Sequence, residues 1–264
     1  MSVAPACIER LAREAGRSLK ILRRRLSRST AIGQPVWARD HLQSLVLIPL
    51  SLAGAWRFQS DGDNKALAFS SARPDPEALE TDFSELAQLE DSPEWSDREF
   101  RGVTSVLDAL SATARWATSQ LLDRFFRLSA NVLSQSDPAL ELPETQQWDG
   151  PRRGRVRAHF EALRKGVSES LAILAVHGNR WFGDRLGIDA VREIAAAVRS
   201  LMTPLRPESL VSLGECLPLS AEAAPDDFLQ IVEDGLKGDS PPVLGLLEPL
   251  QADVSFRLPS EFPV

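Results

Sequence analysis

The residues that most often carry chemistry are histidines and cysteines, and here their spacing does not bring them together. His159 and His177 fall on one predicted helix, but 18 residues of helix separate them, about 27 Å along the axis. His41 is remote from both, and none of the three stands in HExxH or another metal-ligand spacing. Cys7 and Cys216 show no disulfide or metal-ligand spacing, which is typical of free thiols in a reducing compartment. We therefore expect no metal site.

Motifs for nucleotide binding and for nucleophilic catalysis are missing from the sequence. There is no GxxxxGK phosphate loop, and no GxGxxG follows a predicted strand. No GxSxG elbow is present to expose a serine nucleophile. Acidic pairs such as Asp226 and Asp227 fall at expected helix ends, where they complement the helix dipole. The sequence predicts a protein that is not an enzyme and has neither catalytic residues nor a cofactor.

Residues 8–28 (IERLAREAGRSLKILRRRLSR) can be laid out as a helix-turn-helix, with Gly16 in the turn and Leu22 anchoring the second helix. Basic side chains would then stand near that second helix, where phosphates could be neutralised: Arg17, Lys20, Arg23, Arg24 and Arg28. Any small helical hairpin shows similar spacing, and the arginine run lacks the residues that often accompany base readout. A structural hairpin and a DNA-binding regulator both remain open.

Charge alternates in blocks along the chain, whose net charge is −7. Residues 1–30 carry +6 and residues 151–185 carry +5, whereas residues 59–150 carry −11 and residues 186–264 carry −8. Such blocks either steer anions to one face or pair with each other in the folded chain. Internal pairing is the favoured interpretation.

Helical periodicity dominates the chain, beginning with an apolar stripe from Ile8 to Leu26. Pro35 can lie in the first turn of a second helix that runs towards Trp56. Pro49 should kink this helix or divide it in two. Strand signals are almost absent, and residues 91–102 (DSPEWSDREFRG) are predicted to be a loop. Further helices are expected at about 65–70, 76–89, 103–117, 119–135, 155–177, 189–202, 207–216 and 225–237.

This pattern predicts an all-α fold of stacked helical hairpins, with an irregular α-solenoid-like array as one form of it. Prolines and glycines between Ser136 and Gly154 suggest a boundary or a long loop. We therefore expect an N-terminal helical subdomain (1–150), a C-terminal helical subdomain (151–240) and an irregular Pro-rich tail (241–264).

The longest apolar stretch, Leu42 to Trp56, has 15 residues and contains Pro49, whereas a bilayer span needs roughly 20. A buried core helix is therefore expected rather than a membrane span. The N-terminus has no apolar targeting segment, so a cytoplasmic location is predicted. Most of the six tryptophans should anchor the core, but Trp95 and Trp148 fall in expected loops and are candidates for contacting a partner protein.

Four stretches together resemble the helical region downstream of the ATPase module in bacterial STAND-type NTPases, the signal-transduction ATPases with numerous domains. They are GRSLKILRRRLS (16–27), LIPLSLAGAWRF (47–58), DPALELP (137–143) and LPLSAEAAPDDFLQIVEDGL (217–236). The resemblance implies a helical segment between a nucleotide-binding core and a sensor, in proteins implicated in antiphage defence. No ATP-binding residue can be carried over, because no stretch here matches that motif.

The resemblance favours a helical scaffold whose partner is an ATPase or effector encoded nearby. It would also place residues 16–27 in a packed helical or winged-helix-like element, which weakens the DNA-binding alternative. The sequence lacks the ATPase and effector parts, so a stand-alone remnant, a split gene and a truncated reading frame are all compatible with it.

Overall fold

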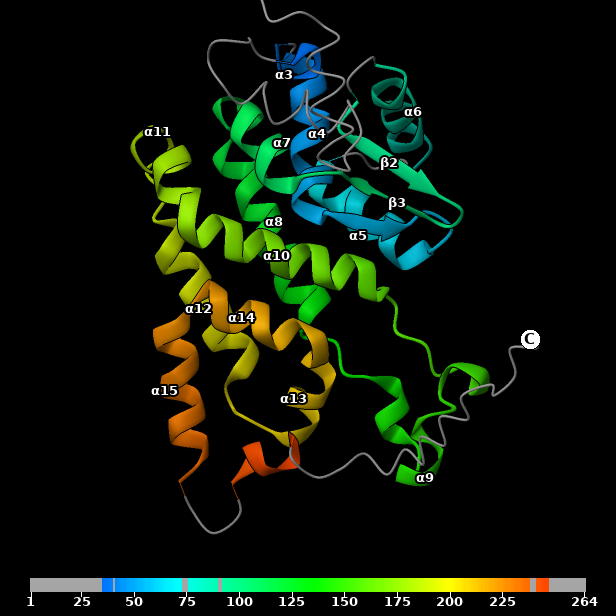
Figure 1. Ribbon diagram of the computed structural model, residues 1–264, viewed down its shortest axis with the longest axis vertical. Helices are drawn as coiled ribbons and strands as arrows, with labels where there is room; N and C mark the ends of the chain where they lie inside the picture. The colour runs from blue at the N-terminus through cyan, green and yellow to red at the C-terminus, as the bar shows by residue number, and fades with distance from the viewer. Residues whose placement is uncertain (1–34, 40, 73–75, 90–91, 238–240, 247–264) are drawn as a thin grey trace, which may run out of the picture.

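Helices dominate the computed structural model, which describes residues 35–39, 41–72, 76–89, 92–237 and 241–246 (Figure 1). The longer helices are α4 (His41–Ala53), α5 (Asp61–Ser71), α6 (Pro76–Ala87), α8 (Ser119–Leu133), α10 (Glu161–Gly178), α12 (Ala190–Met202) and α15 (Pro225–Gly235). The shorter α-helices are α3 (Val36–Arg39), α7 (Val106–Thr113), α9 (Glu144–Gln147), α11 (Asp184–Leu186), α13 (Pro207–Leu213) and α14 (Leu217–Ala223). Turns of 3-10 helix are η1 (Ala114–Trp116), η2 (Pro138–Glu141), η3 (Pro151–Arg153), η5 (Gly214–Cys216) and η6 (Pro242–Leu246), and η4 (Asn179–Gly183) is a π-helical turn.

The predicted all-α class is confirmed, since helices make up most of the described chain. The expected helices at 119–135 and 189–202 correspond closely to α8 and α12. Several helix starts follow from local sequence, because a side-chain oxygen accepts a hydrogen bond from the backbone N–H three residues further on. These capping residues are Ser60 for α5, Ser105 for α7, Thr118 for α8 and Asp189 for α12. The solenoid-like array and the three-part division of the chain stay predictions.

The helix expected to run from Pro35 to Trp56 ends earlier than predicted. Its main part, α4, includes Pro49 without being divided there, and it stops at Ala53. Gly54 follows with a φ of +73°, a left-handed conformation that glycine adopts without steric cost. The chain then turns into a short strand, β1 (Ala55–Arg57), so Trp56 belongs to a sheet.

A three-stranded antiparallel sheet was not predicted, and the expectation of a loop over 91–102 was wrong. β2 (Glu94–Asp97) and β3 (Phe100–Val103) form a hairpin, and β1 pairs with β3, so the order is β1-β3-β2. The register places Trp56 opposite Arg101, and Trp95 opposite Gly102. The hairpin turns at Arg98, which has a φ of +48°. Each strand has at most four residues and the turn lacks Asn-Gly or Asp-Gly, so no period-two signal was available.

Helix α10 lies at the centre of the fold. It runs across the middle of Figure 1, with the sheet and α3–α7 on one side and α12–α15 on the other. It packs on α4 and β1 from the earlier part of the chain, and on α12 and α14 from the later part. The buried side chains form one cluster, to which α10 contributes Leu163, Val167 and Leu171. Among the described residues, no helix combines the length and apolar character needed to cross a bilayer.

Gly166 sets how closely α10 can approach the end of α4. A Cβ atom at this position would lie 2.1 Å from the carbonyl oxygen of Ala53 and 3.0 Å from the backbone nitrogen of Ala55. Because both neighbours belong to the backbone, neither can move aside as a flexible side chain would. The close contact between α10 and the α4–β1 turn therefore requires glycine.

We predict that Gly166→Ala lowers the free energy of unfolding by about 3 kcal/mol, the upper part of the range for overpacked sites, because α10 must separate from α4. Gly183→Ala is the matched control, since a Cβ there would meet its nearest atom at 3.8 Å and the backbone φ is −52°. Urea unfolding followed by circular dichroism measures both. Equal stability of the two variants would contradict the close contact.

Candidate interaction site

The basic residues predicted for nucleic-acid contact, Arg17, Lys20, Arg23, Arg24 and Arg28, lie outside the described residues, as does the whole 8–28 segment. The DNA-binding alternative therefore stays a prediction. The two candidate partner contacts, Trp95 and Trp148, are both described, and they lie on different elements.

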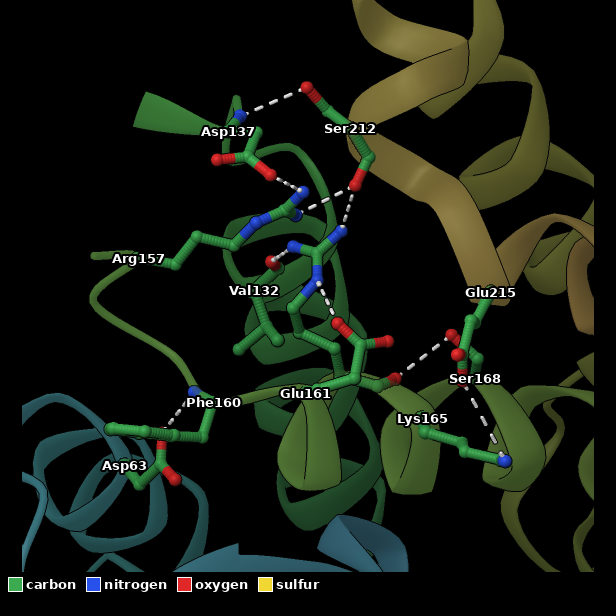
Figure 2. Close-up of polar contacts among 11 residues, drawn as sticks. Asp63, Val132, Asp137, Arg157, Phe160, Glu161, Lys165, Ser168, Ser212 and Glu215 are labelled. Atoms are coloured by element: carbon green, nitrogen blue, oxygen red, sulfur yellow. Dashed lines mark hydrogen bonds and ion pairs between the residues drawn. The ribbon is translucent and has the colours of Figure 1, made fainter. Parts of the chain in front are cut away.

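A polar cluster surrounds the side chain of Arg164, which is 0% exposed. Its neighbours Val132, Glu161 and Ser212 are labelled in Figure 2. Its Nη1 donates to the carbonyl oxygen of Val132 and its Nη2 to the carbonyl oxygen of Ser212, each at 2.7 Å. The carboxylate of Glu161, one helical turn earlier, lies 4.0 Å from its Nε. Arg164 thus joins α10 to the end of α8 and to α13 through charge-assisted hydrogen bonds.

Arg157 reinforces the same junction from the chain that leads into α10. Its Nη1 donates to the Ser212 carbonyl oxygen at 2.7 Å and its Nη2 to the Asp137 carboxylate at 2.8 Å. The backbone N–H of Asp137 in turn donates to the Ser212 hydroxyl at 2.9 Å. We call Asp137, Arg157, Arg164 and Ser212 the arginine clamp (Figure 2).

Electrostatics within the arginine clamp favour its ion pair. Partial burial by itself would raise the pKa of Asp137, but the hydrogen bond from Arg157, the Ala139 N–H and the nearby positive charges hold that pKa below its usual value. Burial lowers the pKa of Arg164, and the like charge of Arg157 acts in the same direction. The clamp therefore gathers two guanidinium groups around one carbonyl and a charged carboxylate.

A second tether holds the end of the connection to α10. The Asp63 carboxylate is fully buried and accepts hydrogen bonds from the backbone N–H groups of Arg57, at 3.0 Å, and Phe160, at 3.1 Å. The guanidinium of Arg57 also lies over the Phe160 ring, 4.4 Å from its centroid. His159 Nδ1 lies 3.7 Å from Asp63. The residue that precedes α10 is thereby fixed against α5 and β1.

Between Asp137 and Arg157, the two ends that the arginine clamp joins, the chain forms a long loop. The 137–157 loop, defined as Asp137 to Arg157, contains η2, α9 and η3 and stands away from the helical body near the α9 label in Figure 1. The core cluster has no member between Leu133 and Leu163. Trp148, at the end of α9, is 70% exposed, and its Nε1–H donates to the Thr145 carbonyl oxygen at 2.9 Å.

Trp95 is less accessible, at 38% exposed. Its ring lies against Gly102 of the neighbouring strand, where a Cβ would meet ring atoms at 2.8 Å. Both candidate tryptophans are thus partly or largely exposed, but Trp95 belongs to the edge strand of the sheet rather than to a loop.

The neighbour of Trp95 on β2 is an unusual carboxyl group. Glu94 is buried, and neither of its carboxyl oxygens has a hydrogen-bond partner. Burial raises the pKa of Glu94 to about 9, against the opposing influence of the Arg101 charge. The guanidinium of Arg101 is held between the rings of Phe58 and Phe83, with centroid distances of 4.5 and 4.7 Å. Glu94 is therefore a neutral carboxyl at pH 7.

Among the described residues, the other candidate groups for chemistry do not form a larger site. Cys216 is a buried free thiol, and burial raises its pKa, so it remains protonated at neutral pH. In the part of the chain that the structure describes, no three or more His, Cys, Asp or Glu side chains are placed to hold a metal ion.

Sequence reasoning missed the clamp, although two signals were present. Arg164 follows Phe160 by four residues and precedes Val167 by three, so it stands within the inward stripe of a predicted helix. The charge blocks gave a second indication, because the basic block 151–185 was expected to pair with the acidic blocks of the same chain. Arg155 pairs with Glu141, and Lys165 with Glu215, as that interpretation predicted.

Comparison with known proteins adds no identification: no protein-family model, no curated protein and no solved structure matches the chain. The resemblance to the helical region of STAND-type NTPases stays a prediction.

We predict that Arg164→Met lowers the free energy of unfolding by about 3 kcal/mol, because buried carbonyl oxygens lose charged donors. The neighbouring Lys165→Met is the matched control, since the Lys165 pair with Glu215 spans 4.0 Å between exposed side chains and should contribute less than about 1 kcal/mol. Thermal and urea unfolding measure both. If the two substitutions cost the same, Arg164 does not hold the junction.

We also predict a specific pH dependence from Glu94. An unfolded glutamate ionises near 4.5, whereas the folded protein keeps this proton up to about pH 9, so unfolding releases a proton between these values. Stability from this group is therefore complete below about 4.5 and declines as pH rises, by at most about 1.4 kcal/mol per pH unit. Glu94→Gln should flatten the decline, and Glu85→Gln, at an exposed position of α6, should not. Parallel stability curves from pH 5 to 9 would refute the assignment.

Proposed function

We propose that this chain is a non-catalytic helical scaffold or protein-interaction segment that contacts a partner protein through the 137–157 loop. One observation carries the proposal: the loop supplies no side chain to the core, yet its base is fixed by the buried arginine clamp. Ordering a chain segment costs about 1–2 kcal/mol per residue in backbone entropy, and no core burial within the loop offsets that cost. Surface loops held on a rigid scaffold carry binding residues disproportionately often.

The composition of the loop supports a protein contact. Interface hot spots are enriched in tryptophan and arginine, and this loop presents Trp148 with Arg152, Arg153 and Arg155 in eight residues of sequence. Although Trp148 is exposed, the backbone around it is ordered. The N–H groups of Asp149, Gly150 and Arg155 all donate backbone hydrogen bonds within the loop. A pre-organised loop loses less freedom on binding.

The partner that we propose follows from the resemblance to STAND-type NTPases. In that setting the chain would act in the cytoplasm next to an ATPase or effector encoded nearby, in signalling or antiphage defence. The buried free thiol of Cys216 supports a reducing compartment. A DNA-binding regulator that uses residues 8–28 is the alternative, and treatment with nuclease separates the two.

We predict that the tagged full-length chain, purified from its native host, recovers a protein partner in stoichiometric amount that survives nuclease treatment. Quantitative mass spectrometry measures the recovery. A variant in which residues 138–156 are replaced by a short Gly-Ser linker should fold but lose the partner, because Asp137 and Arg157 already lie within hydrogen-bond distance. Val176→Ser, at an exposed position of α10, is the matched control and should retain it.

Recovery that depends on nucleic acid would favour the DNA-binding regulator instead. Equal recovery by the linker variant would place the contact outside the 137–157 loop.

A further inference from the structure

The chemistry of the 137–157 loop specifies what kind of surface it fits, an inference that rests on the proposed function. Trp148 is 70% exposed, although tryptophan normally buries most of its large apolar surface. Its single polar group is already satisfied, because Nε1–H donates to the Thr145 carbonyl oxygen at 2.9 Å. An apolar pocket can therefore enclose this ring without stranding a hydrogen-bond donor.

The same hydrogen bond orients the ring before any partner arrives. A side chain held in one conformation loses little entropy when it is buried in an interface. Trp148 therefore combines two properties of an interface anchor, a large apolar surface and a preferred ring orientation.

The arginines beside Trp148 are unequally engaged. Arg152 and Arg153 share the single carboxylate of Asp149, with Nε to oxygen distances of 3.7 and 3.5 Å, which are too long for strong hydrogen bonds. The side chain of Arg152 is 82% exposed, against 48% for Arg153. Arg155 is paired with Glu141 at 2.8 Å. Arg152 is thus the guanidinium most available to a carboxylate from outside the chain.

The charge of the loop favours a protein over a nucleic acid. From Asp137 to Arg157 the sequence holds four acidic residues and four arginines, so the loop is neutral overall. Binding to a polyanion depends on an excess of positive charge that releases counterions. A neutral loop on a chain of net charge −7 supplies no such excess.

We infer that Trp148 and Arg152 form the central contact of the 137–157 loop, and that the partner protein presents an apolar pocket for the indole bordered by a carboxylate for Arg152. The indole supplies apolar contact, and the planar guanidinium supplies a directional, bidentate contact that sets the orientation. The arginine clamp joins the two ends of this loop to α10 and α13.

The first test is site-specific photo-cross-linking in the native host, with p-benzoylphenylalanine in place of Trp148. The same photoreactive residue in place of Val176, which is 69% exposed, is the matched control. We expect position 148 to cross-link to the partner recovered by purification, at apolar residues with an Asp or Glu nearby, and position 176 not to do so. Cross-linking of position 148 to nucleic acid, or equal cross-linking from both positions, would overturn the inference.

The second test measures the affinity of the full chain for that partner by calorimetry. Trp148→Ala should weaken binding by about 30-fold or more, as expected for a hot spot, and Trp148→Phe, which keeps an aromatic ring, by much less. Arg152→Glu should weaken binding more than Arg152→Gln, and the difference should shrink at high salt. Lys165→Glu, with a comparable charge change on α10, is the control and should have little effect.

The outcomes distinguish this inference from the proposed function on which it rests. If purification recovers no partner at all, the scaffold function fails. If a partner is recovered and depends on the 137–157 loop, but Trp148→Ala and Arg152→Glu bind it normally, the scaffold function stands and the assignment of these two residues is wrong.

Discussion

The guanidinium of Arg164 is completely buried, and a buried charge destabilises a fold unless it is surrounded by acceptors. Here the acceptors are main-chain carbonyl oxygens of Val132 and Ser212, groups that need donors of their own at the end of α8 and in α13. Three segments that are distant in sequence therefore satisfy one another at a single point. The central helix cannot shift along α8 or α13 without leaving polar groups unpaired.

This constraint extends from the core to the surface through Arg157. Because Arg157 shares the Ser212 carbonyl with Arg164 and also binds Asp137, both ends of the 137–157 loop meet at the same junction. The loop can then be ordered without contributing side chains to the core. The helical body supplies the stability, and the loop supplies exposed residues. Such a division suits a segment that must present the same residues to a partner while its body stays unchanged.

The small sheet follows a different principle. Arg101 lies between the sheet and α6, and its charge acts on the buried carboxyl group of Glu94. The guanidinium of Arg101 lies against the rings of Phe58 and Phe83, and it pairs with Glu80 at the surface. Glu94 instead keeps its proton, since burial penalises the ionised form. The guanidinium of Arg101 is thus accommodated by aromatic contacts and an ion pair, and the carboxyl group of Glu94 by protonation.

Local sequence was sufficient to predict much of the helical framework. Apolar residues at helical spacing and capping side chains such as Thr118 and Asp189 act within a few residues of themselves, so α8 and α12 could be placed from the chain alone. Prolines and glycines on both sides of Trp148 also indicated the loop that carries this residue.

Tertiary structure decided what depends on distant partners. β1 pairs with β3 across more than forty residues of sequence, and no pattern within three or four residues could reveal such pairing. In the same way, Arg164 could be recognised as a buried anchor only once the carbonyl oxygens of Val132 and Ser212 stood around it. Helices and loop boundaries are set by interactions between near neighbours, whereas strand pairing and the burial of a charge depend on groups that only the complete fold brings together.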